Sequence, residues 1–531
     1  MIDTVALREK VLDLAIRGKL VPQDPNDEPA SVLLDRIRAQ KQQMVKDGKL
    51  KAKDIKDDSI IFVGEDNLHY EKFADGTVEC IEEEIPFNLP IGWSWERLQS
   101  FCFPISDGTH QTPTYTDDGF IFLSAKNVTS WKIDWENVMH IPESLHNELS
   151  KRISPKKNDI LLAKNGTIGV AAIVDRDCDF DIYVTLAVLR TINTSILPQY
   201  LLNAIASSTV QNEFRGSLKG IGVQNLHLEH IRRTLIPIPP YNEQKLISDK
   251  IVEITPLLEH IADTYAEIET AISVLKAKTL DLAIRGKLVP QNPDDEPASV
   301  LLERIRAEKE ELIKQGKLKR DKKESVIFKG EDNSYYEKID GFDICIDEKI
   351  PFSLPENWRW ERLGNISTIA RGGSPRPIED YLTESDDGIN WIKIGDTEQG
   401  GKYISSTREK IIPAGLSKTH YVKSGDFLLT NSMSFGRPYI LKTDGCIHDG
   451  WLVIGDIENV FNQDYLYYAL SSGFMYKAFS EVAAGSTVKN LKSDTVRAVF
   501  FPVPPYDDQV RIANYVEKLF ATLASIENSL N

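Results

Sequence analysis

Apolar side chains recur at alternating steps of four and three residues between positions 244 and 282. This heptad pattern is typical of a long helix that packs against another helix. The same steps occur at the C-terminal end of the chain and continue near its N-terminus. We therefore predict two long helices, one from residues 241–291 and one from residues 506–531 together with 1–23, that pair as an antiparallel coiled coil. The apolar seam consists of Ile247, Ile251, Ile254, Leu258, Ile261, Tyr265, Ile268, Ile272 and Leu275, then of Ile512, Val516, Leu519, Leu523, Ile526 and Leu530, and of Leu7, Val11 and Leu14.

The chain repeats itself in a circular manner. LDLAIRGKLVPQ at 12–23 returns at 280–291, and IPFNLPIGWSWERL from Ile85 returns as IPFSLPENWRWERL from Ile350. VQNL...PIPPYNEQ from Val223 returns as VKNL...PVPPYDDQ from Val488. The second copy ends inside an element that the first copy shows as continuous, and the N-terminal residues supply its missing part. This arrangement predicts a pseudo-twofold molecule with two similar modules held apart by the helices.

The two modules, residues 85–240 and 350–505, open and close alike but differ inside. Their opening tryptophan pairs are expected in the core, and the runs DILLAKNGTIGVAAIV and DFLLTNSMSFGRPYIL join apolar strands through Gly, Asn and Ser turns. The segments 24–84 and 292–349 are predicted to be charged helical insertions or linkers. We interpret their basic stretches, 49–56 and 317–323, as solvated loops, with a DNA or partner patch as the alternative. The predicted fold class is α+β.

Length, amino-acid composition and net charge limit the classes to which this protein can belong. A chain of 531 residues with 41% hydrophobic and 27% charged residues is expected to form several globular domains. It shows neither an apolar run long enough for a membrane span nor a signal peptide, which predicts a cytoplasmic protein. The five cysteines lack CxxC spacing, so neither zinc nor a disulfide framework is predicted. A net charge of −17 argues against nonspecific nucleic-acid binding, unless the acidic residues collect on solvated and partner-facing surfaces.

Several motifs together resemble the specificity subunit of type I restriction-modification systems. They are the circular repeat, LAIRGKL, NLPxxWxWxRL, D-[IF]-L-L-x(5)-G and NL...[IF]P[IV]PP[YF]xxQ, and they span nearly the whole chain. The resemblance implies two α/β target recognition domains, each reading half of a bipartite DNA site, while the helices set the spacing and dock other subunits. It gives the subunit no catalytic centre. The segments 24–84 and 292–349 depart from shorter members, and the resemblance assigns them no role.

The partners that the resemblance implies are double-stranded DNA, two modification (methyltransferase) subunits and restriction (endonuclease/translocase) subunits. S-adenosylmethionine would belong to the modification subunit, and ATP with Mg to the restriction subunit. This chain is expected to bind no cofactor of its own.

Polar loops in each module are candidates for DNA contact, because their side chains offer donors and acceptors for base edges and phosphates. The loop DGTHQTPTY at 107–115 resembles a loop found in many recognition domains, and ARGGSPRPIEDY aligns with it in the second module. An arginine in this segment can form two hydrogen bonds with a guanine base, and a glycine allows a phosphate to approach the backbone closely. The predicted contacts are Thr109, His110, Gln111, Thr112, Lys126, Lys164, Asn165, Lys219 and Gln224 in the first module, and Arg371, Ser374, Arg376, Lys393, Asn431, Ser432, Arg437, Lys489 and Asn490 in the second.

Each candidate has a plainer alternative. The alternative for the loop at 107–115 is a polar turn closed by Pro113, but we favour DNA contact; for Arg371 and Arg376 a surface salt bridge is an equal alternative. Asn165 with Gly166 is typical of a turn formed for its own sake. Asn225 and Asn490 are as well suited to capping a local turn as to touching DNA. We also favour DNA contact for Lys164 and Arg437.

Two other classes of function are alternatives to DNA recognition on behalf of other subunits. IPPY at 238–241 and VPPY at 503–506 approach the catalytic tetrad of amino-methylating DNA methyltransferases, but Ile and Val cannot hydrogen-bond a target amino group. Proline before a helix explains these motifs better. We also find no FxGxG cofactor loop and no metal-spaced companion for His110 or His448. A coiled-coil scaffold without DNA contact remains an alternative, and it predicts no sequence-dependent binding even with partners present.

Overall fold

The computed structural model describes residues 3–192, 195–218, 224–316, 325–398, 400–431, 436–483 and 490–530. The chain divides into two compact units, residues 1–265 and 266–531. This division falls where the circular repeat divides the sequence. Among the described residues, no helix combines the length and the apolar character needed to cross a membrane.

The first unit contains an N-terminal helix, a helix-and-sheet segment and a mixed module that ends in a long helix. Its elements are α1 (Thr4–Ile16), α2 (Ala30–Lys46), β1 (Ser59–Val63), β2 (His69–Phe73), β3 (Val78–Cys80), β4 (Ser94–Arg97), α3 (Leu98–Phe101), β5 (Cys102–Asp107), β6 (Phe120–Leu123), β7 (Met139–Ile141), α4 (Glu143–Leu149), β8 (Ile160–Ala163), β9 (Ala171–Ile173), β10 (Phe180–Ile182), β11 (Leu186–Thr191), α5 (Pro198–Ala206), α6 (Ser208–Gly216), α7 (Leu228–Arg233), β12 (Leu235–Ile238) and the start of α8 (Tyr241–Ile284).

The second unit follows the same order with more strands in its module. Its elements are the end of α8, α9 (Ala298–Lys314), β13 (Ser325–Lys329), β14 (Tyr335–Ile339), β15 (Phe342–Cys345), β16 (Arg359–Arg362), α10 (Leu363–Ile366), β17 (Thr368–Arg371), β18 (Leu382–Thr383), β19 (Ile389–Ile392), β20 (Tyr403–Ile404), β21 (Glu409–Ile411), β22 (His420–Val422), β23 (Phe427–Thr430), β24 (Pro438–Leu441), β25 (Gly445–Ile447), β26 (Trp451–Gly455), α11 (Gln463–Leu470), α12 (Gly473–Ala483), α13 (Ser493–Arg497), β27 (Phe500–Val503) and α14 (Tyr506–Ser529).

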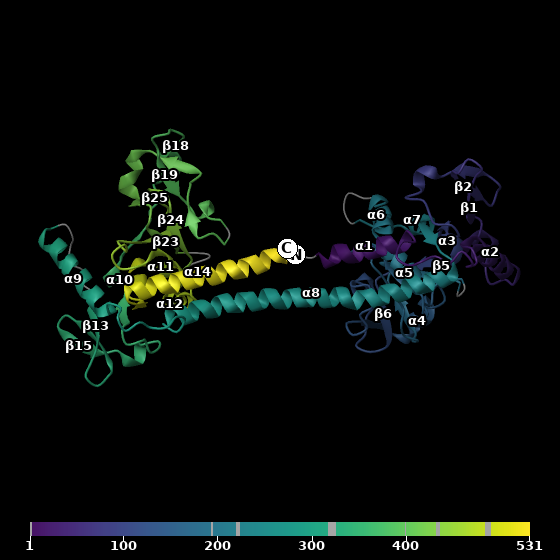
Figure 1. The fold of residues 1–531 in the computed structure, drawn as a ribbon. Helices are drawn as coiled ribbons and strands as arrows, with labels where there is room; N and C mark the ends of the chain where they lie inside the picture. The colour runs from purple at the N-terminus through teal and green to yellow at the C-terminus, as the bar shows by residue number, and fades with distance from the viewer. Residues whose placement is uncertain are drawn as a thin grey trace. The chain divides into compact units, whose positions relative to one another are not determined.

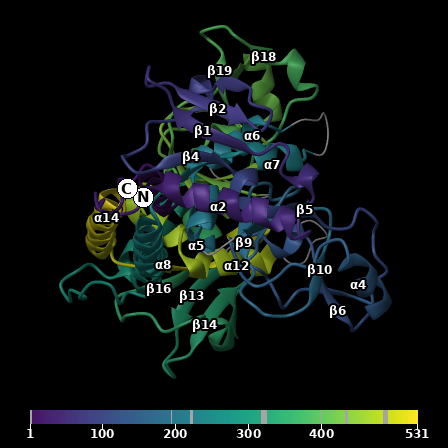
Figure 2. The ribbon, with the colours of Figure 1, turned by 90° about the vertical axis from the view of Figure 1, so that its right-hand side faces the viewer.

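Besides a two-stranded ladder, each module holds two larger sheets, whose sizes differ between the units. The first has the strand orders β5-β11-β8-β9 and β10-β6-β7, whereas the second has β17-β26-β23-β24-β20 and β18-β21-β19-β25-β22. Figures 1 and 2 show that β6 and α4 lie on the opposite side of the first unit from β1 and β2. The predicted α+β class is thus confirmed, together with the divergent interior of the two modules.

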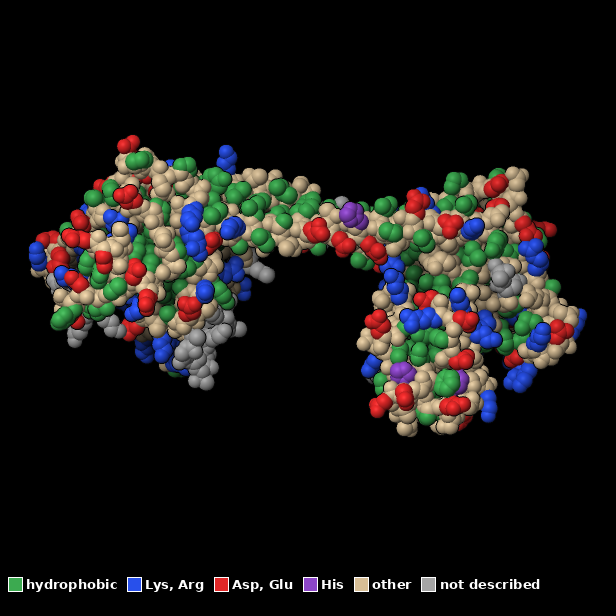
Figure 3. Space-filling view, turned by 90° about the horizontal axis from the view of Figure 1, so that it is seen from below, with side chains coloured by type: hydrophobic (Ala, Val, Ile, Leu, Met, Phe, Trp, Pro, Cys, Tyr) green, Lys and Arg blue, Asp and Glu red, His purple; other side chains and the backbone are tan. Residues whose placement is uncertain are grey.

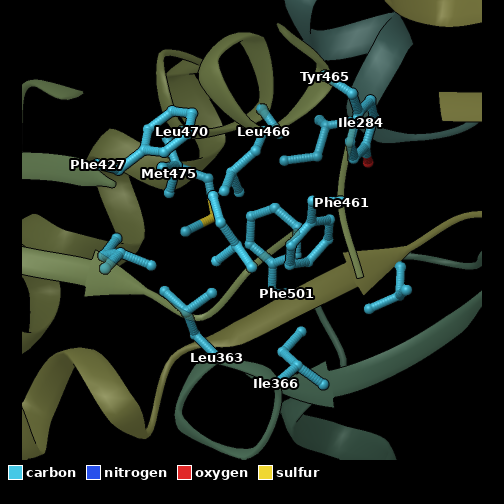
Figure 4. Close-up of a cluster of buried hydrophobic side chains, with 14 of the residues drawn as sticks. Ile284, Leu363, Ile366, Phe427, Phe461, Tyr465, Leu466, Leu470, Met475 and Phe501 are labelled. Atoms are coloured by element: carbon cyan, nitrogen blue, oxygen red, sulfur yellow. The ribbon is translucent and has the colours of Figure 1, made fainter. Parts of the chain in front are cut away.

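A short antiparallel ladder closes each module by pairing its first strand with its last. β12 pairs with β4 so that Leu235 lies opposite Arg97, and β27 pairs with β16 in the same way. Figure 4 shows the apolar core beside this ladder in the second unit, where Phe501 of β27 and Phe461 pack with ring centroids 5.2 Å apart. Ile284 at the end of α8 is buried in the same core. The ladder and this core therefore fix the long helix to the module.

The opening tryptophans bind the start of a helix, as well as filling the core as predicted. The indole N–H of Trp93 donates to the Glu243 carboxylate at 2.8 Å, and that of Trp358 donates to Asp508 at 2.8 Å. All four residues are buried. Because the same contact spans 150 residues in each unit, it is part of the repeated frame.

The ladder and the tryptophan contact, which recur in both units, are called the frame here. The glutamine of each PPYxxQ motif adds a further contact to this frame. The Gln244 side chain is fully buried, accepts the N–H of Leu197 at 2.9 Å and donates to the carbonyls of Ser195 and Pro239 at 3.1 and 3.2 Å. Gln509 makes the corresponding three bonds in the second unit. One amide thus satisfies three backbone groups where the chain turns from strand into long helix.

The segments 24–84 and 292–349 contain the expected charged helices, α2 and α9, and also a three-stranded antiparallel sheet that we did not predict. A buried ion pair fastens each sheet to its module. In the first unit Arg97 pairs with Glu71 at 2.7 Å, and the Ser59 hydroxyl donates to the same carboxylate at 2.5 Å. The same three positions are occupied in the second unit by Arg362, Glu337 and Ser325. These segments are therefore integral parts of each unit. The lysines at 49–56 are exposed, in keeping with a solvated loop, whereas 317–323 lies outside the described residues.

The helix α2 also brings a cation to a buried carboxyl group of β4. The Arg38 guanidinium lies 3.4 Å from the Glu96 carboxylate, whose side chain is 1% exposed. Burial raises the pKa of Glu96 to about 7, although Arg38 acts in the opposite direction. Glu361 occupies the same place in the second unit, with Arg306 at 3.0 Å, and burial raises its pKa too.

Within residues 266–531, the part of α8 that belongs to the second unit packs antiparallel to α14, as predicted. Lys276 of α8 pairs with Glu527 near the end of α14 at 2.9 Å, while Asp295, beyond the end of α8, pairs with Arg511 near the start of α14. Figure 1 shows the two helices side by side. In the first unit, α1, α6 and α8 line a pocket of about 460 Å³. The helix α8 continues through Pro256 as one element.

Replacing the buried amide that anchors α8 should weaken the first unit selectively. Gln244→Ala leaves an N–H and two carbonyls without their partner, which should lower the free energy of unfolding by about 2–4 kcal/mol. Amide hydrogen exchange, which resolves local stability, would measure this in residues 1–265. The exposed neighbour Lys245→Ala is the control. Equal effects of the two substitutions would contradict the anchoring role.

Glu96 should make stability fall as the pH rises. Its folded-state pKa of about 7 lies above the ordinary value of 4.5, so the folded state binds the proton more tightly. The resulting stabilisation is present below about pH 4.5 and is lost as the pH rises through 7. Glu96→Gln should therefore flatten the decline in urea midpoint between about pH 5 and 8. An unchanged slope would show that Glu96 stays ionised.

Candidate nucleic-acid interface

Three polar segments that are distant in the sequence meet at Lys164 in the first module. The backbone N–H of Lys164 donates to the Thr185 carbonyl at 2.8 Å, and its own carbonyl accepts the N–H of Leu226 at 2.9 Å. Its ammonium group donates to Asp107 at 2.6 Å. The loop after β5, the loop after β8 and the segment that closes the module are thereby held in one place. The sequence predicted DNA contacts in all three of these segments.

The loop after β5 is fixed by a close backbone approach. A Cβ atom on Gly108 would lie 1.9 Å from the Ile182 carbonyl oxygen, so only glycine fits there. The N–H of Thr109 donates to that same carbonyl at 3.1 Å, and the Thr109 carbonyl accepts the N–H of Val184 at 2.9 Å. The loop therefore turns outward directly afterwards, which leaves the His110 side chain 63% exposed.

The carboxylate of Asp107 lies beneath this loop and is itself buried. One oxygen accepts the Lys164 ammonium, and the other accepts the Arg152 guanidinium at 2.8 Å. The His110 Nε2 atom lies 3.5 Å from this second oxygen. A buried carboxylate with two cations satisfies the rule that buried charges are paired, and it connects the loop to the turn after α4.

We call the place where these segments meet at Lys164 the junction of the first module. The second module has a corresponding junction, centred on the neutral residue Asn431. The N–H of Asn431 donates to the Gly450 carbonyl at 3.0 Å, and its carbonyl accepts the N–H of Leu491 at 2.9 Å, as at Lys164. Its side-chain amide donates to the backbone carbonyl of Asp449 at 2.7 Å. The two modules therefore share the backbone of this junction and differ in its side chains.

An exposed loop with two arginines covers the second junction. The Ser374 hydroxyl donates to the Asp449 carboxylate at 3.0 Å, and the Arg371 Nε–H donates to the Asp449 carbonyl at 3.1 Å. Arg376 is 82% exposed and lies 3.8 Å from the same carboxylate. A Cβ atom on Gly372 would lie 2.2 Å from a backbone oxygen, so a glycine is required here as it is at Gly108.

Most candidates that the structure describes lie on the surface or at its margin. Thr109, Asn165, Ser374, Arg437 and Asn490 are half-buried, and the Lys393 ammonium pairs with Glu409. Arg437 lies over the Tyr439 ring at 5.3 Å. Lys219, Ser432 and Lys489 lie outside the described residues. The exposed candidates are His110, Gln111, Thr112, Lys126, Gln224, Arg371 and Arg376.

Two candidates are buried. Lys164 is 4% exposed and its ammonium is bound to Asp107; Asn431 is 1% exposed and its amide is bound to the Asp449 backbone. Both side chains hold the loops together, whereas the sequence favoured Lys164 as a DNA contact. Arg152, conversely, is exposed at the junction and was not predicted.

The IPPY and VPPY motifs lie where a strand ends and a long helix begins. Ile238 and Val503 are fully buried at the ends of β12 and β27, and the prolines directly precede α8 and α14. This placement agrees with proline before a helix. Within the described part of the chain, no cluster of His, Cys, Asp and Glu could hold a metal ion.

The middle of α8 carries acidic residues without basic ones. Between positions 251 and 275 the helix carries five acidic residues and no lysine or arginine. Figure 3 shows acidic side chains along the exposed side of this helix, whereas blue lysine and arginine side chains are interspersed with them over the modules. Part of the net negative charge therefore lies on a helix surface, away from the loops.

The frame and its two junctions define a protein with a pair of related recognition modules. Residues 114–270 and 355–531 match the family described as type I restriction modification DNA specificity domain. The match covers more than half of the chain, so the protein belongs to this family.

Known relatives and a solved structure agree with this assignment. The Escherichia coli EcoAI specificity subunit is 30% identical over an alignment of 421 positions, gaps included, that covers 69% of this chain and 63% of that protein's length. The E. coli EcoEI specificity subunit is 25% identical over an alignment of 597 positions, gaps included, that covers 99% of this chain and 90% of that protein. A structure from work on assembly and conformational transition of the type I system has a TM-score of 0.53 at 18% identity, covering 84% of this chain and 94% of that one. It supports the fold.

Replacing Gly108 should displace the loop without unfolding the frame. Gly108→Ala forces a Cβ into a backbone oxygen, and overpacking of this kind costs about 1–3 kcal/mol. We expect faster amide exchange at Thr109 and Val184, together with a lower denaturation midpoint. Gly216→Ala, where nothing lies within 4 Å of the added atom, is the matched control. Identical exchange in the two variants would contradict the close approach.

Proposed function

We propose that this chain is the DNA sequence-specificity subunit of a type I restriction-modification complex and reads a bipartite target, one half-site per module. The observation that carries the proposal is the repeated junction, in which an identical backbone arrangement presents different exposed side chains in each module. Direct readout of base edges needs such rigidly placed polar groups. Two different sets of loops on one frame suit a target with two different halves.

The proposed contacts are the exposed and half-buried polar residues of the two junctions. They exclude Lys164 and Asn431, which act by holding the loops. In the first module they are Thr109, His110, Gln111, Thr112, Lys126, Asn165 and Gln224, and in the second Arg371, Ser374, Arg376, Lys393, Arg437 and Asn490. Lys219, Ser432 and Lys489 remain predictions from the sequence.

The long helices are proposed to dock two modification subunits and, through that core, the restriction subunits. Four apolar residues on α8 are more than half exposed, namely Leu246, Val252, Leu257 and Val274. Large apolar side chains that are exposed on a helix can contribute to a protein–protein interface. Methylation with S-adenosylmethionine would take place on the modification subunit, and ATP with Mg would act on the restriction subunit. The chain itself is proposed to be non-catalytic and to act in the cytoplasm.

Methylation mapping tests the proposal directly. Long-read detection of N6-methyladenine in host DNA, with this gene intact and deleted and the partner methylase present in both strains, should show a split motif that disappears on deletion. Exchanging residues 85–240 for another such module should change one half of the motif and leave the other. Unchanged methylation after deletion would favour the scaffold alternative. Methylation by the purified chain alone would favour the methyltransferase alternative.

A further inference from the structure

The first junction contains an exposed arginine whose position is set by a buried carboxylate. Arg152 lies in the turn after α4, where its N–H donates to the Leu149 carbonyl at 2.9 Å. Its side chain is 50% exposed, and one terminal nitrogen donates to Asp107 at 2.8 Å. Within the described part of the chain, its guanidinium donates to that carboxylate and to no other group.

Asp107 is well placed to orient this guanidinium. Its side chain is 5% exposed, and its other oxygen is held by the Lys164 ammonium at 2.6 Å. The carboxylate therefore cannot rotate without breaking a buried ion pair, which is costly. Arginine carries five N–H donors in a planar fork, so one terminal nitrogen can bind Asp107 while donors remain for a ligand.

The second module also places an arginine near an aspartate, at a longer distance and beside a more exposed carboxylate. Arg376 lies 3.8 Å from the Asp449 carboxylate and is 82% exposed. The two arginines come from different segments: Arg376 lies in the loop after β17, and Arg152 lies in the turn after α4. An exposed arginine beside an aspartate at the junction is thus common to both modules, although its place in the sequence is not.

We infer that Arg152 is a specificity-determining residue that reads a guanine in the first half-site, with Asp107 as its positioning residue. Arginine pairs with the O6 and N7 atoms of guanine through two parallel hydrogen bonds, and this needs a guanidinium held in one orientation. His110, 3.5 Å from the same carboxylate oxygen, places the loop after β5 beside the same base pair. This inference rests on the proposed function.

Arg152→Lys tests the inference because it keeps the positive charge and loses the fork. The full chain, produced with its modification partner, would be compared with the wild type by long-read mapping of N6-methyladenine at every variant of the first half-site. We expect discrimination at one guanine position to fall by about tenfold to a hundredfold. The other positions and the second half-site should be read as before.

Lys151→Gln is the matched control, since it removes a positive charge from the adjacent exposed residue. It should leave the motif unchanged. A motif unaltered by Arg152→Lys, an equal loss of methylation at all sites, or a first half-site without a G·C pair would each overturn the inference. These results differ from failure of the proposed function, in which deleting the whole gene would leave methylation unchanged.

Discussion

The antiparallel ladder that closes each module is the constraint on which the rest of the structure depends. It joins β4 to β12 and β16 to β27, strands at opposite ends of a long stretch of sequence. The buried side chains of Gln244 and Gln509 then fasten the long helix to the closed module. Once the two ends are fixed in this way, the loops between them can change without moving the helix. The two copies are accordingly similar in sequence at the frame and differ in the segments between its parts.

The junctions show how one backbone arrangement accepts two kinds of chemistry. At Lys164 a buried charge requires a buried partner, and Asp107 supplies it; at Asn431 an amide bonds a backbone carbonyl and needs no counter-ion. The ionic solution costs desolvation of two charges, which their mutual attraction and further hydrogen bonds must offset. In return it brings a third charged group, Arg152, to the same carboxylate. The two junctions therefore differ in the charged groups that they bring together.

Much of the frame was predictable because its signals are periodic or repeated. The heptad seam predicted α8, and the matching motifs placed the two modules and their tryptophans. The sheets of the two insertions were missed because strands such as SIIFV and HYEKF are short and lie in a charged context, where the helix signal dominated. Sequence alone could not show that Lys164 is buried, since its partner Asp107 is 57 residues away. Arg152 was missed for the same reason, because no local motif marks it.

The charge of the whole chain proved a poor guide to its candidate interface. A net charge of −17 describes a long-range field, which governs the encounter with DNA and weakens within about 10 Å at ordinary salt. Contacts at a base edge depend instead on groups within hydrogen-bonding distance. The acidic stretch of α8 adds negative charge without adding any to the loops, and two aspartates at the junctions, Asp107 and Asp449, lie beside cations. Specific recognition by an acidic protein is thus physically consistent, provided that local geometry, rather than overall attraction, supplies the discrimination.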